Sequence, residues 1–184
     1  HLNVQSIINK IDVLGTYLDQ NMCSVFCVSE HWVTQKILLE TIHLHGFTLA
    51  TSFCRQKHIH GGVCIFLRNE VKYRELDVNA FCVELHAEFC ALHLQTLNCL
   101  VVTVYRSTNG DFEIFSDKFN QVIEHCFNRC KNLIILGDYN IEFRLNCISK
   151  ARFRDMHRHG KFIKRTWSYL YNHRGNENRV IVLR

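Results

Sequence analysis

Proline is absent from this chain of 184 residues. An average usage of about 5% would place roughly nine prolines in a chain of this length. Turns therefore lack the residue that most often fixes φ at their first central position. The absence favours an atypical or decaying sequence.

Long apolar runs are also missing. No run approaches the roughly 18 residues that a membrane span needs. The N-terminus lacks the basic segment, apolar segment and small-residue cleavage site that follow one another in a signal peptide. We therefore expect an intracellular protein with no membrane partner. Because the chain begins at His1, we also expect a fragment whose first element has been cut.

The ten cysteines show no metal-binding pattern, because no two of them have the Cys-x-x-Cys spacing typical of zinc sites. Two pairs lie four residues apart, Cys23 with Cys27 and Cys126 with Cys130. Free cysteine is among the most buried residue types. Reduced core residues are the favoured interpretation, since three cysteines lie inside apolar, strand-like runs: Cys64, Cys82 and Cys99.

The net charge of +5 is mild and would suit a polyanionic partner without requiring one. The basic excess is concentrated after residue 143. This segment is either a solvated, disordered stretch or a nucleic-acid-binding arm. Its basic residues are Arg144, Lys150, Arg152, Arg154, Arg158, Lys161, Lys164 and Arg165.

Hydrophobic periodicity predicts helices at both ends of a strand-rich middle. One amphipathic helix is expected over 6–20, and a second over 112–126, which Asn109-Gly110-Asp111 can cap. Strands are expected over 1–4, 24–29, 47–53, 61–67, 71–76, 81–89, 100–105 and 131–136. This order indicates an α/β architecture with large mixed sheets and helices outside. After Phe143 no clear period is present, and we expect that part to be the least ordered.

Polar side chains directly follow three of the apolar strands. Glu30 follows 25–29, Tyr105 ends 100–104, and Asp138 with Asn140 follows 133–136. Strand ends can aim side chains at a shared site. The alternative is that each acid only ends a strand or starts a turn.

Five motifs in this chain resemble the endonuclease domain of non-LTR retrotransposons in order and approximate spacing. That family belongs to the endonuclease/exonuclease/phosphatase superfamily, whose fold is deoxyribonuclease-I-like. The resemblance covers residues 1–143. It implies an α/β sandwich of two mixed, largely antiparallel sheets with helices outside, and this fold is expected to be incomplete at its C-terminal end. The motifs are Asn3-Val4-Gln5-Ser6, Val28-Ser29-Glu30-His31-Trp32, Gly61-Gly62-Val63, Val102-Thr103-Val104-Tyr105-Arg106 and Ile134-Ile135-Leu136-Gly137-Asp138-Tyr139-Asn140.

The resemblance implies a Mg²⁺-dependent DNA-nicking phosphodiesterase, with Mn²⁺ as a substitute cation. Glu30, supported by Asn3, would hold the cation, since Mg²⁺ needs only one or two protein carboxylates. Asp138 would orient or deprotonate the attacking water, Asn140 would bind the phosphate and fix Asp138, and Tyr105 would hold a phosphate oxygen.

The sequence departs from the family at its C-terminal end. The family's Ser-Asp-His triplet is absent, and none of His157, His159 and His173 follows Ser-Asp. The segment 166–170 does not reproduce the family's Asp-bearing strand. We therefore expect impaired catalysis, a domain over 1–143 and a divergent basic tail over 144–184.

Further expectations follow from the resemblance. We expect a nuclear location if the chain is functional. We also expect a covalent linkage to a reverse transcriptase domain in the parent element. The alternatives are a non-catalytic relic or nucleic-acid-binding fragment, and a phosphomonoesterase of the same superfamily.

Overall fold

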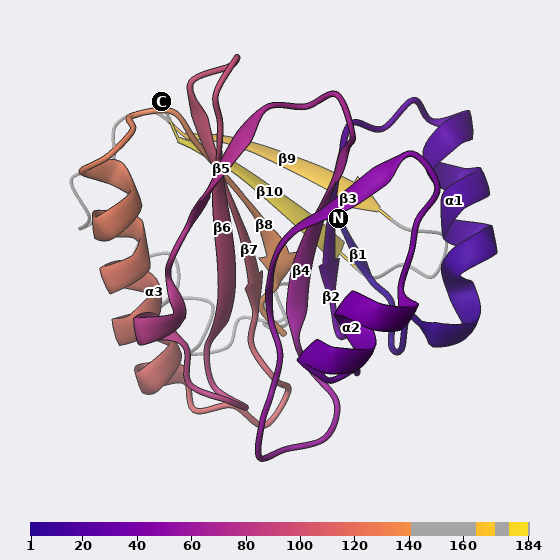
Figure 1. The fold of residues 1–184 in the computed structure, drawn as a ribbon. Helices are drawn as coiled ribbons and strands as arrows, with labels where there is room; N and C mark the ends of the chain where they lie inside the picture. Colours follow the sequence, from indigo (N-terminus) through magenta and orange to yellow (C-terminus); the bar gives the residue numbers. More distant parts are fainter. Residues whose placement is uncertain (141–164, 172–176, 184) are drawn as a thin grey trace.

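Two β-sheets form the centre of the protein (Figure 1). The computed structural model describes residues 1–140, 165–171 and 177–183. The four-stranded sheet has the order β1 (Leu2–Asn3), β2 (Val25–Ser29), β4 (Val63–Arg68), β3 (Phe47–Phe53). The six-stranded sheet has the order β5 (Tyr73–Leu76), β6 (Glu88–Leu94), β7 (Cys99–Tyr105), β8 (Leu133–Asp138), β10 (Glu177–Leu183), β9 (Arg165–Tyr171). Among these strand pairs only β1 with β2 and β7 with β8 are parallel, so both sheets are mixed and largely antiparallel, as predicted.

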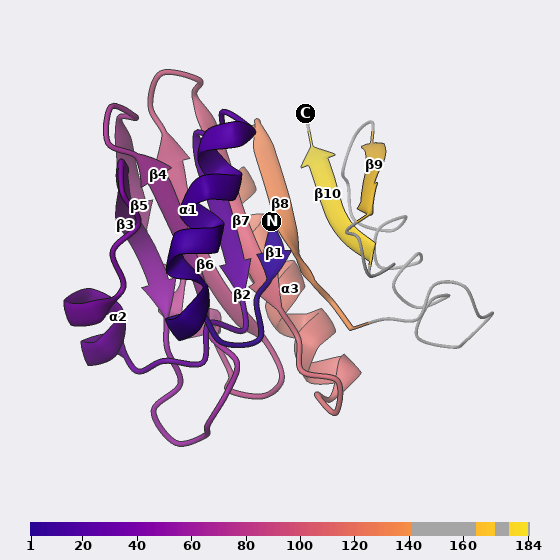
Figure 2. The same ribbon diagram turned by 90° about the vertical axis from the view of Figure 1, so that its right-hand side faces the viewer.

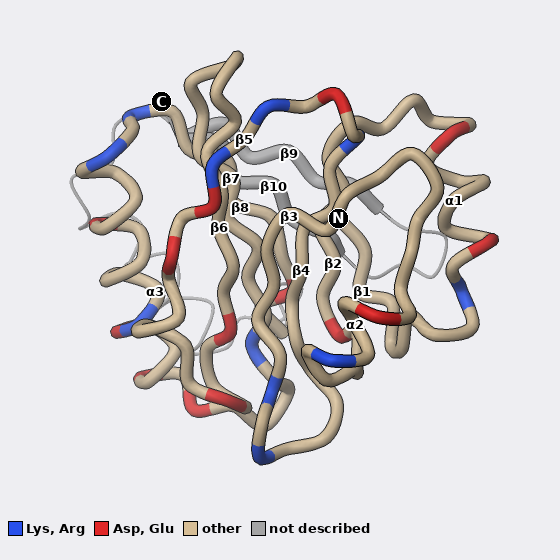
Figure 3. Tube along the Cα trace, in the orientation of Figure 1, with Lys and Arg blue, Asp and Glu red and all other residues tan. Residues whose placement is uncertain are grey.

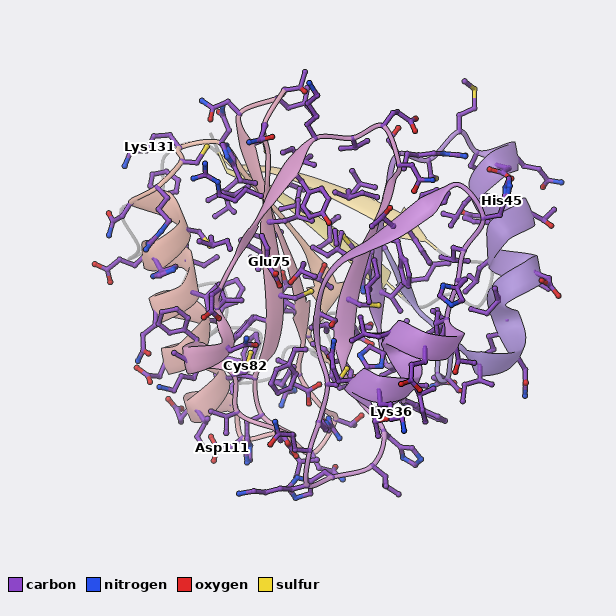
Figure 4. The ribbon with its side chains drawn as sticks, in the orientation of Figure 1. Lys36, His45, Glu75, Cys82, Asp111 and Lys131 are labelled. Carbon is purple, nitrogen blue, oxygen red and sulfur yellow. The ribbon has the colours of Figure 1, made fainter. Side chains whose placement is uncertain are left out.

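Helices lie on the outer faces of the two sheets, which gives a four-layered sandwich (Figures 1 and 2). The four-stranded sheet is covered by α1 (Ile11–Gln20), which follows the 3₁₀ turn η1 (Ile8–Lys10), and by α2 (Gln35–Thr41). The six-stranded sheet is covered by α3 (Phe112–Phe127), next to the 3₁₀ turn η2 (Asn79–Phe81). The side chain of Asp111 accepts hydrogen bonds from the amides of Glu113 and Ile114, as the capping prediction requires (Figure 4).

Strand alternation sends apolar side chains from the central strands into separate cores. In β2, Phe26 and Val28 pack with α1 and α2, whereas Cys27 faces the other sheet. In β7, Val102 and Val104 pack against α3, and Tyr105 faces the layer between the sheets. Both faces of β2 and β7 are therefore buried, which explains their continuous apolar sequences.

Most predicted elements are confirmed, and three details differ. The strand predicted over 81–89 is wrong: this stretch holds the end of η2 and a connection, and β6 begins only at Glu88. The short helix α2 was not predicted, because its seven residues are too few for a clear helical period. The prediction also missed β9 and β10, although β10 pairs with β8 (Figure 2) and its Val180-Ile181-Val182 run is β-branched.

Several predictions fall on 141–164 and 172–176, which lie outside the described residues. They include the domain boundary at residue 143, His157, His159 and His173, and all the basic tail residues except Arg165. Within the described part of the chain, no helix is long and apolar enough to cross a bilayer. The nine cysteines that the structure describes are all free thiols.

Candidate active site

Four strand ends meet at one edge of the sandwich. The parallel pairing of β1 with β2 sets Asn3 opposite Ser29, one residue before Glu30. The parallel pairing of β7 with β8 sets Tyr105 opposite Asp138. Because β2 packs against β7 and β8, and β1 against β8, these two groups of residues come together. Each pair lies at the carboxyl ends of its parallel strands, where ligands bind in many α/β folds.

The amide of Asn3 joins the two predicted carboxylates. Its Nδ2 atom donates hydrogen bonds of 2.8 Å to Glu30 Oε1 and of 2.8 Å to Asp138 Oδ2. The site is therefore assembled from both sheets through a single amide nitrogen. Hydrogen bonds to carboxylates are stronger than neutral ones, so Asn3 holds the two acids at a fixed separation.

Glu30 is held in an unusual backbone conformation. Its φ is 57° and that of Trp32 is 60°, in the left-handed region that non-glycine residues rarely adopt. Backbone hydrogen bonds maintain this turn: the amide of Glu30 donates to the Gly62 carbonyl at 2.8 Å, and the amide of Trp32 to the Gly61 carbonyl at 3.0 Å. The indole Nε1 of Trp32 also donates to Glu30 Oε2 at 3.1 Å. Both oxygens of Glu30 are thereby oriented.

Buried His31 supports the same turn from behind. Its Nδ1 accepts from the amide of Val33, so the neutral ring carries its proton on Nε2 and donates it to the Phe53 carbonyl at 3.1 Å. Burial lowers the pKa of His31 to about 4. Gly62 packs so closely on this ring that a Cβ there would collide with it, which gives a physical reason for glycine in the motif.

The turn after β8 is fixed by Arg106. Its Nε donates to the Tyr139 carbonyl at 2.8 Å, one terminal nitrogen donates to the Asn140 carbonyl at 2.7 Å, and the other donates to the Gly110 carbonyl. In return, Asn140 Nδ2 donates to the Arg106 carbonyl at 2.6 Å. The amide of Asn140 donates to Asp138 Oδ1 at 3.0 Å. The backbone amide of Asn140 therefore fixes Asp138, whereas its side-chain amide donates to Arg106.

Tyr105 lies beside Glu30 on the inner face of the six-stranded sheet. Burial, followed by the charge of Glu30 and a hydrogen bond to it, raises the pKa of the Tyr105 hydroxyl. The hydroxyl is therefore a proton donor at neutral pH. A protonated hydroxyl at this position can donate a hydrogen bond to an oxygen acceptor.

A buried ion pair that was not predicted from the sequence lies beneath the site. Arg55 and Glu88 are almost fully buried; Arg55 Nε donates to Glu88 Oε1 at 2.6 Å, and a terminal nitrogen donates to Ser107 Oγ at 2.7 Å. The guanidinium lies 5.9 Å from the centroid of the Tyr105 ring. Two features of the sequence could have indicated this ion pair. One is the position of Glu88 directly before the apolar run 89–92. The other is the Gly61-Gly62 pair, because a Cβ at Gly61 would collide with Arg55.

The donor set fits a hard divalent cation. Glu30 and Asp138 supply carboxylate oxygens, which Mg²⁺ prefers, and water and phosphate usually complete its coordination. In the structure Asn3 turns its nitrogen toward both acids, while its oxygen accepts from the Gln5 amide at 3.3 Å. A cation between the acids would therefore require the Asn3 amide to rotate so that its oxygen faces the metal.

No protein-family model matches this chain, and no curated protein is similar to it at a significant level. Solved structures are similar in fold. The 3′-5′ exonuclease NExo of Neisseria meningitidis has a TM-score of 0.64 at 16% identity, over 98% of this chain and 84% of that one. The endonuclease domain of TRAS1, a telomere-specific non-LTR retrotransposon, has a TM-score of 0.63 at 9% identity, over 98% and 94% of the two chains.

A third similar structure is an endonuclease/exonuclease/phosphatase of Bacteroides vulgatus. Its TM-score is 0.60 at 10% identity, over 95% of this chain and 78% of that one. The fold is therefore the deoxyribonuclease-I-like fold of endonuclease/exonuclease/phosphatase proteins.

Proposed function

We propose that this chain is a metal-dependent phosphodiester hydrolase that nicks DNA, descended from a non-LTR retrotransposon endonuclease. The observation that carries the proposal is the meeting of Glu30 and Asp138 on one Asn3 amide, with Tyr105 beside Glu30. The parent element would link this domain to a reverse transcriptase.

Each residue has a distinct chemical role in the proposed reaction. Glu30, assisted by Asn3, would hold Mg²⁺ or Mn²⁺, which supplies charge stabilisation for the scissile phosphate and the leaving oxygen. Asp138 would orient and deprotonate the attacking water. Asn140 would bind the phosphate, and the protonated Tyr105 hydroxyl would donate to a phosphate oxygen.

Turnover is expected to be reduced. General acid–base catalysis and stabilisation of developing negative charge each contribute on the order of 10²–10⁴-fold. The histidine and aspartate of the family's Ser-Asp-His triplet are missing from the sequence. A chain without them should retain cation binding and only slow nicking.

Conversion of supercoiled plasmid to the nicked form in Mg²⁺ tests the proposal. Slow nicking by the wild-type chain is expected, and Asp138→Asn or Glu30→Gln should abolish it. The matched control is Asp117→Asn, which removes one carboxylate from the exposed side of α3 and should leave nicking unchanged. Nicking that persists in Asp138→Asn would contradict the assigned site.

The same metal chemistry also serves phosphomonoesters, and the similar fold of a phosphatase-related protein makes this the second candidate activity. A DNA oligonucleotide with a 3′-phosphate distinguishes the two. Release of inorganic phosphate without plasmid nicking would support the phosphomonoesterase. If neither substrate reacts and duplex DNA is still bound, the chain is a non-catalytic binding fragment.

A further inference from the structure

The hydroxyl of Ser107 lies between the buried Arg55 guanidinium and the Tyr105 phenol. A terminal nitrogen of Arg55 donates to Ser107 Oγ at 2.7 Å. The Tyr105 hydroxyl is hydrogen-bonded both to Ser107 and to Glu30. The Arg55 group also lies 5.9 Å from the centroid of the Tyr105 ring. One continuous line of hydrogen bonds therefore runs from the buried ion pair to the carboxylate that we propose as a metal ligand.

The chemistry of the groups fixes the direction of each hydrogen bond in this line. A guanidinium has only donors, so Ser107 Oγ accepts from Arg55. The single hydroxyl proton of Ser107 is then directed to its other partner, the Tyr105 oxygen. A carboxylate only accepts, so the proton of Tyr105 points toward Glu30. Donation therefore runs in one direction, from Arg55 through both hydroxyls to Glu30.

The first donor in the line is held on all sides. Arg55 is almost fully buried; its Nε donates to Glu88 Oε1 at 2.6 Å, and its other terminal nitrogen donates to the Ile59 carbonyl at 3.1 Å. Glu88 in turn accepts from the amides of Gly62 at 2.7 Å and Leu85 at 3.2 Å. Every nitrogen of the guanidinium is therefore occupied, which fixes the orientation of the whole planar group.

Strand register brings the same groups together through the backbone. Glu88 is paired with Tyr105 across β6 and β7, so the ion pair lies against the strand that carries the phenol. Ser107 follows just beyond the end of β7, and its side chain is only partly exposed. Figure 3 shows both acidic and basic positions at this lower end of the sandwich. Side chains supported by strands are held more precisely than side chains on loops.

A phenol whose proton has a fixed direction is a prepared hydrogen-bond donor. In the proposed reaction the Tyr105 hydroxyl donates to a phosphate oxygen, and a donor that is already oriented avoids reorganisation as negative charge develops. The bond accepted from Ser107 also polarises the phenol, which strengthens the bond that the phenol donates. Without Ser107, the phenol proton has a second in-plane position that points away from Glu30.

We propose that Ser107, supported by Arg55, is a positioning residue for the Tyr105 hydroxyl during hydrolysis. Ser107 makes no contact with the scissile phosphate and acts only through the phenol. This inference rests on the proposed function, and it adds two residues to those on which the rate depends. The alternative is that Ser107 only stabilises the turn after β7, in which case its contribution would not depend on Tyr105.

A double-mutant cycle of Ser107→Ala and Tyr105→Phe distinguishes these two roles. In the plasmid assay, Ser107→Ala should lower the maximal nicking rate about five- to tenfold, the value of one hydrogen bond. The Mg²⁺ concentration for half-maximal nicking should not change, because Glu30 keeps its bonds from Asn3 and Trp32. In a Tyr105→Phe background, Ser107→Ala should have no further effect on the rate. A further loss of similar size in that background would overturn the inference.

Two more variants identify the hydroxyl as the group responsible. Ser107→Thr keeps a hydroxyl on the same carbon and should restore most of the rate that Ser107→Ala loses. The matched control is Ser24→Ala, which removes an exposed hydroxyl before β2, at the opposite end of that strand from Glu30, and should leave nicking unchanged. Equal losses in Ser107→Thr and Ser107→Ala would contradict a role for the hydroxyl.

Urea unfolding of the four proteins of the cycle tests the hydrogen bond without any catalysis. Each single substitution breaks the same Ser107–Tyr105 bond, so the two single shifts in unfolding midpoint should sum to more than the shift of the double variant. Additive shifts would overturn the inference even if the wild type nicks plasmid. Non-additive shifts in a chain that nicks no plasmid would uphold the Ser107–Tyr105 bond and refute only the catalytic proposal.

Discussion

Asn3 and Asp138 are 135 residues apart in the sequence and are joined by one hydrogen bond of 2.8 Å. The same nitrogen holds Glu30, so a neutral amide separates two carboxylates that would otherwise repel each other. This arrangement keeps the site assembled without a cation. A change at Asn3 should therefore alter how strongly the stability of the fold depends on a bound cation.

Asn3→Asp should make the protein depend on divalent cations. It replaces two donated hydrogen bonds by a third negative charge, which should lower the free energy of unfolding in EDTA by about 1–3 kcal/mol. Bound Mg²⁺ stabilises the folded state in proportion to its occupancy, so the variant should regain stability as Mg²⁺ is added. Thermal unfolding with and without Mg²⁺ measures this. An identical Mg²⁺ response in the exposed control Asn79→Asp would contradict the explanation.

Trp32→Phe should weaken the cation site while keeping an aromatic ring against His60. The indole donates to Glu30 Oε2, and phenylalanine cannot. Loss of a partner that orients a metal ligand typically costs about 10–100-fold in metal affinity. The Mg²⁺ concentration for half-maximal nicking should rise within that range, with little change in the maximal rate. A lower maximal rate at unchanged Mg²⁺ dependence would point to a substrate contact instead.

Gly137→Ala should strongly destabilise the protein. Gly137 pairs with Val104 in the parallel register, and a Cβ at position 137 would collide with the Val104 carbonyl, which is fixed in the sheet. A backbone shift there should cost about 1–3 kcal/mol. The control Gly15→Ala lies in α1 with open space around it and should stabilise by about 0.5–1 kcal/mol. Urea unfolding compares both, and effects of the same sign would contradict the packing argument.

Arg106→Lys should show that this arginine organises the Asp138 turn. Three carbonyls, of Gly110, Tyr139 and Asn140, accept from its planar group, and an ammonium cannot reach all of them in this geometry. Each buried acceptor left unsatisfied costs about 1–3 kcal/mol. Unfolding in urea should therefore shift to lower concentrations, and nicking should slow. Arg129→Lys, which donates to one carbonyl on the exposed end of α3, should change stability by less than about 0.5 kcal/mol.

The parts of the site that follow apolar strands could be found from the sequence. Glu30 and Asp138 each end a buried run, and the run itself fixes their place at the edge of a sheet. The Asn3 bridge could not be found this way, because it depends on how the two sheets pack. The Arg55–Glu88 pair could not be predicted for a related reason. Arg55 lies in a loop without hydrophobic periodicity, and Glu88 lies inside the stretch 81–89, which was wrongly predicted as one strand.

The pH dependence of stability should reveal the buried state of His31. Its pKa falls from 6.5 in the unfolded chain to about 4 in the folded one, mainly because burial disfavours the imidazolium. Between these values the unfolded state binds a proton that the folded state does not. His31 therefore contributes its full stabilisation above about pH 6.5, and this is lost as the pH falls toward 4, for a total of about 3 kcal/mol.

Urea unfolding at a series of pH values tests this in the wild type and in His31→Asn. Asparagine can still accept from the Val33 amide, but it does not titrate. The variant should be less stable at pH 7 and should lose less stability between pH 6.5 and 4 than the wild type. His93→Asn, on β6 with a partly exposed ring, keeps His31 and should retain the wild-type slope. If His31→Asn loses stability as steeply as the wild type, acid sensitivity originates elsewhere, and the turn that carries Glu30 does not depend on a neutral His31.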